Sequence, residues 1–571
     1  MRLQTTVLGA GVIQGLIFWW LWHALKLGHW PATEPLAYTA LLYAAFAVPL
    51  VIYCLQGIAR FPAWLRRAAA LAYLVVYAAL GAYAAWASGA TGRQTGLEPA
   101  NVLAALVLGF VSLSLLCGFD VALRRWNYAR LFNYTWRNGI LLVTAAAMTG
   151  AAWLVLFAGA SLMALIGVKQ IKDLITEPAF IFPVTSLVFA AAFSLGLARA
   201  AMAESIRRFW LSISSWLLPL VLFFGVLWAA AVPFTGLDPL FKTKSAALIM
   251  LWFAALAVKF SNCAYQDGEI SSPYPPWLAR ATQAAWLSLL PVVAIAWWAL
   301  GLRVAQHGLS EQRLWAGLVA AIAAIYAVGY ALSWLKAERW IASIARTNIV
   351  AAIVLCLGLL AFLTPLADIQ RLAVSFHVRH VTAAHGAIEP DWNYLRWRSG
   401  RFGREALQGI AASTDGPTDG KWQKQATSML AQTRPFETAP TVVSEAYVQE
   451  KLRVFPRQQM LPASFLKHVQ ASKQDWMFSK CLEASASCVV WLGDLNNDGQ
   501  NELLLFNSER QMHGTVFTQS NDTWKQAGNF SSRGSDGKFD SARLEDAHIA
   551  QPDWSDLVVD GKRLRLQLNQ Q

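Results

Sequence analysis

The chain has 571 residues, 56% of them hydrophobic, and a formal net charge of +13. The hydrophobic content exceeds what a soluble protein needs, and it lies almost entirely before residue 366. Charge divides at the same place: residues 1–366 hold 24 Lys and Arg against 11 Asp and Glu, whereas residues 367–571 hold 23 of each kind. This composition excludes an ordinary soluble enzyme and predicts a membrane domain followed by a soluble one.

Eleven stretches have the length of a membrane span, since a helix needs about 20 apolar residues to cross about 30 Å of hydrocarbon. The fifth is long enough to predict a tilted or broken helix. The first is predicted to be retained, because Trp19, Trp20 and Trp22 fill the place where a small-residue cleavage site would lie. The stretches are 7–25, 36–56, 68–88, 101–120, 139–166, 179–201, 212–235, 245–265, 281–304, 313–335 and 347–366.

Basic residues indicate the orientation of these spans, because cytoplasmic loops carry an excess of Lys and Arg. With the N-terminus inside, 15 basic residues fall on the inner side and 8 in outer loops. An odd number of spans then places residues 367–571 outside. The sequence therefore predicts a multi-pass protein of the bacterial inner membrane, with a cytoplasmic N-terminus and a periplasmic C-terminal domain. The same loops account for the positive charge, so nucleic acid is not expected as a partner.

The soluble half is expected to contain helices first and a sheet afterwards. Residues 367–411 are predicted to form a juxtamembrane helical segment, and residues 412–440 an exposed linker rich in Thr, Asp, Gly and Pro. Residues 441–571 are predicted to form an α+β periplasmic domain with a small antiparallel sheet. Its strands are the runs CVVWLGD, ELLLFNS, GTVFTQS and TWKQAGNF, which turn-forming residues separate. The predicted fold class is a polytopic α-helical membrane protein of about 11 spans with a C-terminal α+β soluble domain.

Two cysteines lie in the soluble half, Cys481 and Cys488. Their place in an oxidising compartment favours a disulfide over two free thiols. A zinc site is not expected, because no second pair completes four ligands.

The strongest local motif is GDLNNDGQNE, between two apolar runs. Asp494, Asn496 and Asp498 alternate, Gly499 permits a tight turn, and Glu502 follows. Calcium takes about six to eight oxygen ligands, which such a loop supplies. Leu505 stands where an EF-hand has its bidentate Glu, so an EF-hand is excluded. Two interpretations stay open: a strand–loop–strand calcium site, and a metal-free hairpin that uses the same residues for its turn.

Two other groups of polar residues are weaker candidates for a functional site. Lys259, Asn262 and Asp267 form the most polar piece of any span, which indicates either a polar pocket or a snorkelling helix end. His377, His380 and His385 cluster after the last span, where a solvated helix is a simpler interpretation than a metal site.

Signatures of catalysis and transport are sparse. The chain has no P-loop, no HExxH and no GxSxG motif. Gly9, Gly11 and Gly15 lie inside a span, so we expect helix packing there and not dinucleotide binding. No span holds the mid-membrane acid expected of a typical proton-coupled transporter.

Several pieces of the sequence resemble the bacterial membrane protein family catalogued as domain of unknown function 4153. They are TGLDPLFKT, NCAYQDG, VAQHGLSEQRLWA, YLRWRSGRFGREAL, the Cys481/Cys488 pair, DLNNDGQNE and WSDLVVDGKRLRL. The resemblance implies a multi-span inner-membrane protein with an extracytoplasmic tail, and it carries no established activity or site.

The sequence therefore favours a non-enzymatic envelope protein whose periplasmic domain binds a protein or envelope ligand while the spans contact membrane lipid. A transporter or lipid-handling protein is the alternative, with a polar pocket at Lys259, Asn262 and Asp267 as its expected feature. A membrane-bound enzyme comes third.

Overall fold

The computed structural model separates the chain into two units, residues 1–430 and 431–571, which are treated individually below. The residues that it describes are 2–58, 61–90, 97–268, 273–334, 340–383, 389–413, 420–432, 445–457, 459–471, 478, 481, 488–506, 513–520, 523–531, 544–545, 547, 549, 557–559 and 562–564.

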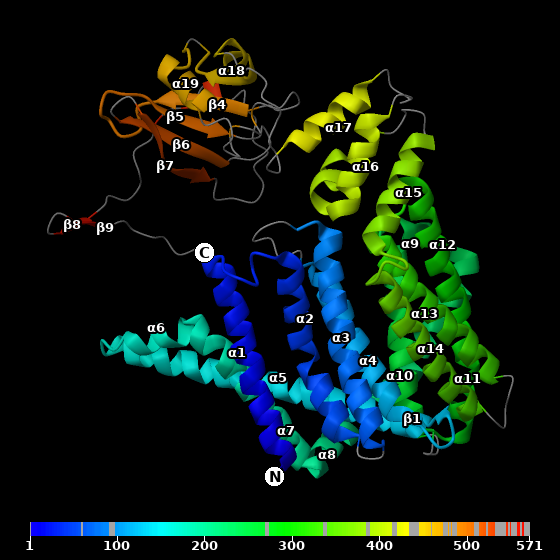
Figure 1. Ribbon diagram of the computed structural model, residues 1–571. Coiled ribbons are helices and arrows are strands. Elements are labelled where there is room, and N and C mark those ends of the chain that lie inside the picture. Colours follow the sequence, from blue (N-terminus) through cyan, green and yellow to red (C-terminus); the bar gives the residue numbers. More distant parts are fainter. Residues whose placement is uncertain are drawn as a thin grey trace. The chain divides into compact units, whose positions relative to one another are not determined.

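The first unit is a bundle of α-helices, and within the described residues eleven of them are long and apolar enough to cross a membrane (Figure 1). The predicted fold class of a multi-pass helical membrane protein is confirmed. The spanning helices are α1 (Arg2–Leu27), α2 (Pro35–Ile52), α3 (Ala63–Ser88), α4 (Pro99–Gly118), α5 (Tyr128–Leu165), α7 (Pro178–Ala198), α8 (Ala200–Thr235), α10 (Ala246–Tyr265), α11 with α12 (Pro276–Ala285, Leu289–His307), α13 (Glu311–Trp334) and α14 (Trp340–Phe362).

Helix α5 departs most from its predicted span, because it begins at Tyr128 and not near residue 139. Its 38 residues extend about 57 Å, nearly twice the hydrocarbon thickness. Figure 1 shows it steeply inclined to the upright helices α2 and α3. The extra turns at its start carry the polar residues Asn133 and Arg137. Hydropathy therefore underestimates the length of the helix, because it leaves out the end where the polar residues lie.

Polar backbone atoms inside the bundle receive partners from neighbouring helices. Pro49 lies within α2 and has no N–H, so it leaves the carbonyl of Ala45 without its helical donor. The Nε2 atom of Gln14, on α1, donates to that carbonyl at 2.9 Å. A side chain from another helix thus replaces the missing bond, as a bundle surrounded by lipid requires.

Helices α1 and α7 pack closely because glycines remove side chains from their contact. A Cβ atom on Gly15 would lie 2.5 Å from Pro183 Cα, and one on Gly11 would lie 2.5 Å from Ala190 Cβ. Gly9 has nothing within 4 Å of that position. Gly11 and Gly15 therefore serve helix packing, as the sequence predicted.

After the last span the chain folds back onto the bundle as α15 (Ile369–Ala383), η3 (Tyr394–Arg398) and α16 (Gly400–Ala412). Tyr83 donates to Asp368 Oδ2 at 2.9 Å, and Gln370 donates to Glu98 Oε2 at 3.0 Å. Burial raises the pKa of Asp368, while the backbone amide of Arg371 and the Tyr83 hydroxyl oppose that rise. These bonds fix the start of α15 to α3 and α4.

The predicted linker at 412–440 was wrong for part of its length. Residues Lys421–Ala431 form α17, in which Trp422, Ala426 and Met429 are buried. Their spacing of four and three residues puts them on one helix face, where they join a cluster with Leu407 of α16. The helix was not predicted because this amphipathic pattern is short and is surrounded by Thr, Asp, Gly and Pro, which favour turns. Residues 414–419 and 433–440 of that stretch lie outside the described ones.

The second unit contains a five-stranded sheet in the order β3-β4-β5-β6-β7, with α18 (Glu445–Lys451) and α19 (Ala463–Ala471) before and between its strands. The four predicted strands are β4 (Cys488–Gly493), β5 (Glu502–Phe506), β6 (His513–Ser520) and β7 (Thr523–Ser531), and they pair antiparallel. The sheet is not purely antiparallel, however, because β3 (Leu452–Phe455) pairs parallel to β4. That strand is not among the four that the sequence predicted.

The core of this domain lies on both faces of the sheet. Val490, Leu492 and Leu505 pack with Phe465 and Val469 of α19, whereas Val489 and Trp491 point to the other face. Burial of β4 on both sides explains its unbroken apolar run.

We predict that a side chain at the α1–α7 contact destabilises the bundle. Gly15→Ala should lower the free energy of unfolding by about 1–3 kcal/mol, because the new methyl group would clash with backbone atoms of Phe182 and Pro183, which cannot move aside. Gly9→Ala, on the same helix but in open space, should leave stability unchanged or raise it slightly. Thermal unfolding of the full chain in detergent measures both. Equal losses in the two variants would contradict close packing at Gly15.

Candidate functional site

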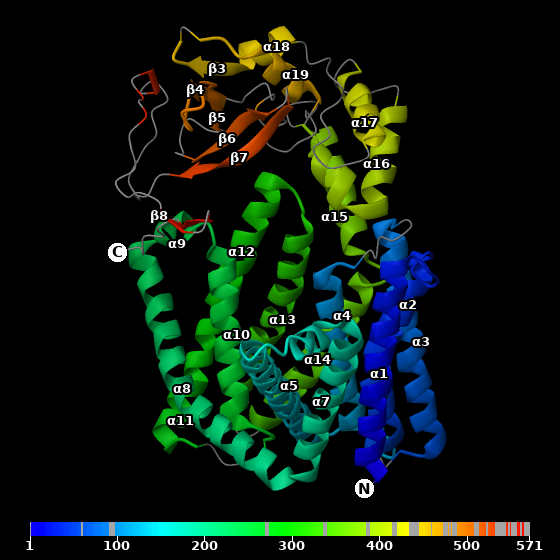
Figure 2. The same ribbon diagram turned by 90° about the vertical axis from the view of Figure 1, so that its left-hand side faces the viewer.

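Arginines gather at one end of the bundle, which we call the basic end. It holds the α4–α5 connection, with the short strands β1 (Phe119–Asp120) and β2 (Arg125–Trp126), and the start of α8. Figures 1 and 2 both place this connection and the start of α1 at the end away from α15. The side chains responsible include Arg66, Arg67, Arg124, Arg125, Arg130, Arg137, Arg207 and Arg208.

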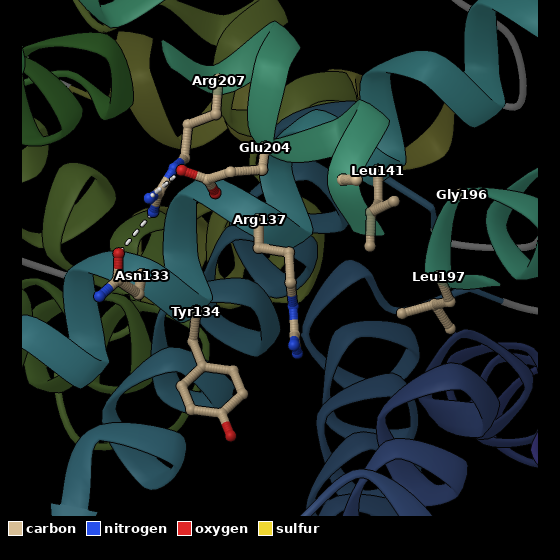
Figure 3. Close-up of a pocket in the computed structure, with 9 residues that line it drawn as sticks. Asn133, Tyr134, Arg137, Leu141, Gly196, Leu197, Glu204 and Arg207 are labelled. Carbon is tan, nitrogen blue, oxygen red and sulfur yellow. Dashed lines mark hydrogen bonds and ion pairs between the residues drawn. The ribbon is translucent and has the colours of Figure 1, made fainter. Parts of the chain in front are cut away.

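A cavity of about 530 Å³ lies at the basic end between α5, α7 and α8 (Figure 3). Helix α5 contributes four lining residues, α7 contributes Gly196 and Leu197, and α8 contributes Glu204 and Arg207 among others. Only Arg199 separates α7 from α8, so consecutive helices supply this part of the lining. The cavity is within the size range of ordinary ligand pockets, about 300–1,000 Å³.

Arg207 is held at the edge of this cavity. Its guanidinium donates to Glu204 Oε1 at 2.7 Å and to Asn133 Oδ1, the bond drawn in Figure 3. Its Nε atom is buried and has no hydrogen-bond partner among the described residues. Glu204 therefore balances the charge of Arg207, and one donor atom is left unused.

The second arginine that lines the cavity, Arg137, has no carboxylate partner to balance its positive charge. It donates to the hydroxyl of Tyr53 at 2.6 Å and lies over the ring of Tyr134, 4.8 Å from its centroid. Within the described part of the chain, no ion pair is formed by Arg137. Tyr53 belongs to η1 (Tyr53–Gly57), a π-helical turn that ends α2, and such turns are frequent at functional sites. In Figure 3 the Arg137 side chain extends into the open part of the pocket.

Part of the cavity lining is apolar. Leu141 and Leu197 form this part, and Gly196 brings α7 against α5: a Cβ there would lie 2.6 Å from Leu141 Cδ2. Leu141 is itself buried. The cavity therefore combines one uncompensated positive charge and several N–H donors with hydrocarbon walls. That combination suits a ligand with an anionic head and an apolar body.

Sequence reasoning missed this site. It counted Arg137 and Arg207 only among the basic residues that set orientation. The available signal was the spacing of Asn133, Arg137 and Leu141, which lie on one face of a helix that begins before its predicted span.

The three polar residues singled out in the eighth span have different surroundings. Asn262 lines a second cavity of about 240 Å³ between α4, α5, α10, α13 and α14. Lys259 is exposed, with Nζ 5.4 Å from the ring centroid of Phe260 and 5.9 Å from that of Trp210. Asp267 follows the end of α10 and is half-buried. Only Asn262 therefore faces an internal cavity, and Lys259 reaches the helix surface.

The Asp/Asn loop between β4 and β5 closes on its own backbone. Asp494 accepts from the amides of Asp498 and Gly499 at 3.1 and 2.9 Å, and Glu502 accepts from the amide of Leu495 at 2.8 Å. Asn496 Nδ2 lies between Asp498 Oδ2 and Glu502 Oε1, at 2.9 and 3.0 Å. Among the described residues, no group of three or more His, Cys, Asp or Glu side chains is arranged to hold a metal ion. Calcium binding by Asp494, Asn496, Asp498 and Glu502 stays a prediction.

The expected disulfide is present. Cys481 and Cys488 are bonded, with their Cα atoms 5.4 Å apart, and both are buried in the core of the second unit. Cys54, Cys117, Cys263 and Cys356 are free thiols in or beside spans.

The histidines after the last span have a structural contact. Nε2 of His377 accepts from the backbone amide of Asp391 at 3.1 Å, which ties α15 to the segment before η3. His385 lies outside the described residues. The arrangement positions the tail and brings no third ligand to His377 and His380 within the described chain.

Comparison with protein-family models, curated proteins and solved structures finds no match to this chain. Membership of the family catalogued as domain of unknown function 4153 therefore stays a prediction, and the site rests on its own geometry.

We predict that acid loosens the α15–η3 contact through His377. Burial lowers the pKa of His377, although the carboxylate of Asp391 partly opposes this. The undocked imidazole thus takes up a proton at a higher pH than the docked one, so the docking stability is complete above about pH 6.5 and is lost as the pH falls below that value. Hydrogen exchange of residues 377–398, corrected for intrinsic rates, should speed up between pH 7.5 and pH 5.5.

His377→Gln should flatten this pH dependence, whereas the matched variant His380→Gln should keep it. The opposite pattern would show that another group controls the contact.

Proposed function

We propose that this protein is a lipid-handling membrane protein that binds the phosphate headgroup of a lipid in the cavity between α5, α7 and α8. The observation that carries the proposal is the uncompensated charge of Arg137 in a cavity that is also lined by the apolar residues Leu141 and Leu197. Arg presents N–H donors in a fork that matches a phosphate. Leu141 and Leu197 supply the surface that an attached hydrocarbon chain would contact.

The proposal includes an orientation in the membrane. We place the basic end in the cytoplasm of a bacterial cell, at the inner leaflet of the inner membrane, and residues 431–571 in the periplasm. The excess of Arg at one end supports the first part, because positive loops resist translocation. The Cys481–Cys488 disulfide supports the second, since disulfides persist in oxidising compartments. Anionic lipids of the cytoplasmic leaflet would then meet Arg137 directly.

Binding of a periplasmic protein or envelope ligand by residues 431–571 is a separate proposal. The two cavities described above lie in the first unit. Lipid handling by the spans therefore has the stronger support.

Removal of the Arg137 charge should weaken binding of an anionic lipid. Arg137→Gln should raise the dissociation constant for phosphatidylglycerol about tenfold to hundredfold, which corresponds to the loss of a charged hydrogen-bonding group. The full chain in phosphatidylcholine nanodiscs, titrated with a fluorescent phosphatidylglycerol, measures it.

The matched control is Arg67→Gln, which removes the same charge from an exposed position on α3 at the same end. Arg137 is exposed too, so the two positions differ in that Arg137 lines the cavity and Arg67 does not. The dissociation constant of Arg67→Gln should therefore stay within about twofold of the parent, since a surface charge outside the site is screened. If Arg67→Gln and Arg137→Gln weaken binding equally, the lipid responds to surface charge alone and the pocket is not its site.

The orientation is testable through the cysteines. In intact spheroplasts, a membrane-impermeant maleimide should label Cys481 and Cys488 only after reduction, which opens the domain core that holds them, whereas the thiols Cys54, Cys117 and Cys263 inside the helical bundle should not react. Labelling of the reduced pair that requires lysis of the membrane would place the C-terminal domain in the cytoplasm.

A further inference from the structure

The second cavity lies on the opposite side of α5 from Arg137. Tyr128, Leu131, Phe132, Thr135 and Trp136 line it, whereas Asn133, Tyr134, Arg137 and Leu141 line the first. At 100° per residue these two sets occupy opposite faces of the first turns of α5. The two cavities are therefore separate sites.

The lining of the second cavity is neutral. It consists mainly of apolar side chains from α4, α5, α13 and α14, and none of its lining residues is charged. Its two small hydroxyls are already used within their own helices: Ser114 donates to the carbonyl of Phe110 at 2.9 Å, and Thr135 donates to that of Leu131 at 2.8 Å. The polarity of the site comes from elsewhere.

Two asparagines from different helices supply that polarity. Asn348, on α14, is only 7% exposed, and its Nδ2 donates to Asn262 Oδ1 at 2.7 Å and to the Tyr128 hydroxyl at 2.9 Å. Asn262 Oδ1 also accepts from Tyr330 at 3.2 Å. The four residues come from α5, α10, α13 and α14, so the network joins the helices around the cavity.

The network leaves hydrogen-bonding capacity unused. Asn262 Nδ2 has two N–H groups, Asn348 Oδ1 has two lone pairs, and neither atom has a hydrogen-bond partner among the described residues. If the oxygen and nitrogen of both side-chain amides are exchanged, the atoms without a partner are Asn348 Nδ2 and Asn262 Oδ1, which again are one donor and one acceptor. Whichever way the amides are assigned, the cavity has a donor and an acceptor at its edge.

We propose that this cavity binds the hydroxyl group of an uncharged lipid, with the lipid's hydrocarbon chain along the apolar walls. A hydroxyl is the smallest group that donates and accepts together, which matches the free N–H and C=O. A charged group is disfavoured because no lining residue balances it. A volume of about 240 Å³ equals that of about eight water molecules, so most of the space is left for the chain.

This inference does not rest on the anionic-lipid site, because it concerns different residues on the other face of α5. The test uses the full chain in phosphatidylcholine nanodiscs with a long-chain alcohol that carries a photoreactive diazirine. After irradiation, the labelled peptides are identified by mass spectrometry. Two matched probes have the same chain with a methyl ether, which cannot donate, or with a carboxylate, which is charged at pH 8.

The alcohol should label residues 111–115, 322–326 and 351–355 about tenfold more than either matched probe does, as expected when the ether loses one neutral hydrogen bond and the carboxylate must be buried unpaired. Asn348→Leu should remove this preference. Thr135→Val, which changes a lining hydroxyl already bonded to its own helix, should keep it.

A second variant tests the same site in case Asn348→Leu does not fold. Ala352→Leu fills the cavity from α14 and leaves both asparagines in place, so it should reduce labelling while the melting temperature stays near that of the parent. Equal labelling by alcohol and ether would overturn the inference, as would labelling that survives both variants. Labelling confined to the lipid-facing part of α5 would show a cavity that holds water alone.

Discussion

Polar atoms in this bundle must find their partners on neighbouring helices, because lipid offers none. This constraint explains contacts that are distant in the sequence. Gln14 satisfies the carbonyl that Pro49 leaves open, and Asn348 bonds to Asn262 on another helix. Tyr83 and Asp368 join the tail to the bundle in the same way. The helices are therefore placed by their few polar atoms as much as by their many apolar ones.

Where this pairing is incomplete, the structure offers sites for ligands. Arg137 has a tyrosine partner but no carboxylate, and the two asparagines keep one donor and one acceptor at the edge of a neutral cavity. Both cavities include the first turns of α5, on opposite faces, so one helix separates an anionic-headgroup site from a neutral one. The cavities differ in charge, and under the proposals above they would therefore take different classes of lipid.

The sequence predicted the elements that depend on local patterns. Eleven apolar stretches became eleven long helices, four short runs between turn-forming residues became β4 to β7, and the Cys481–Cys488 pair is bonded. It failed where a pattern is short or mixed. The short apolar pattern of α17, made by Trp422, Ala426 and Met429, was not recognised because turn-forming residues surround it. Strand β3 was not predicted because it depends on parallel pairing with a strand more than thirty residues later. Of the site residues, Asn262 was found because its span is unusually polar. Asn348 was not found, since a single Asn near a helix end looks like a solvated position until its partner 86 residues away is known.

The central claim is that a lipid headgroup is bound between α5, α7 and α8. An electron cryomicroscopy map of the full chain in nanodiscs of phosphatidylglycerol and phosphatidylcholine tests it most directly. The account predicts headgroup density with a phosphate oxygen about 3 Å from the Arg137 guanidinium and a chain along Leu141 and Leu197. A cavity that is closed, or that is filled by water while lipid headgroups are ordered elsewhere, would contradict it.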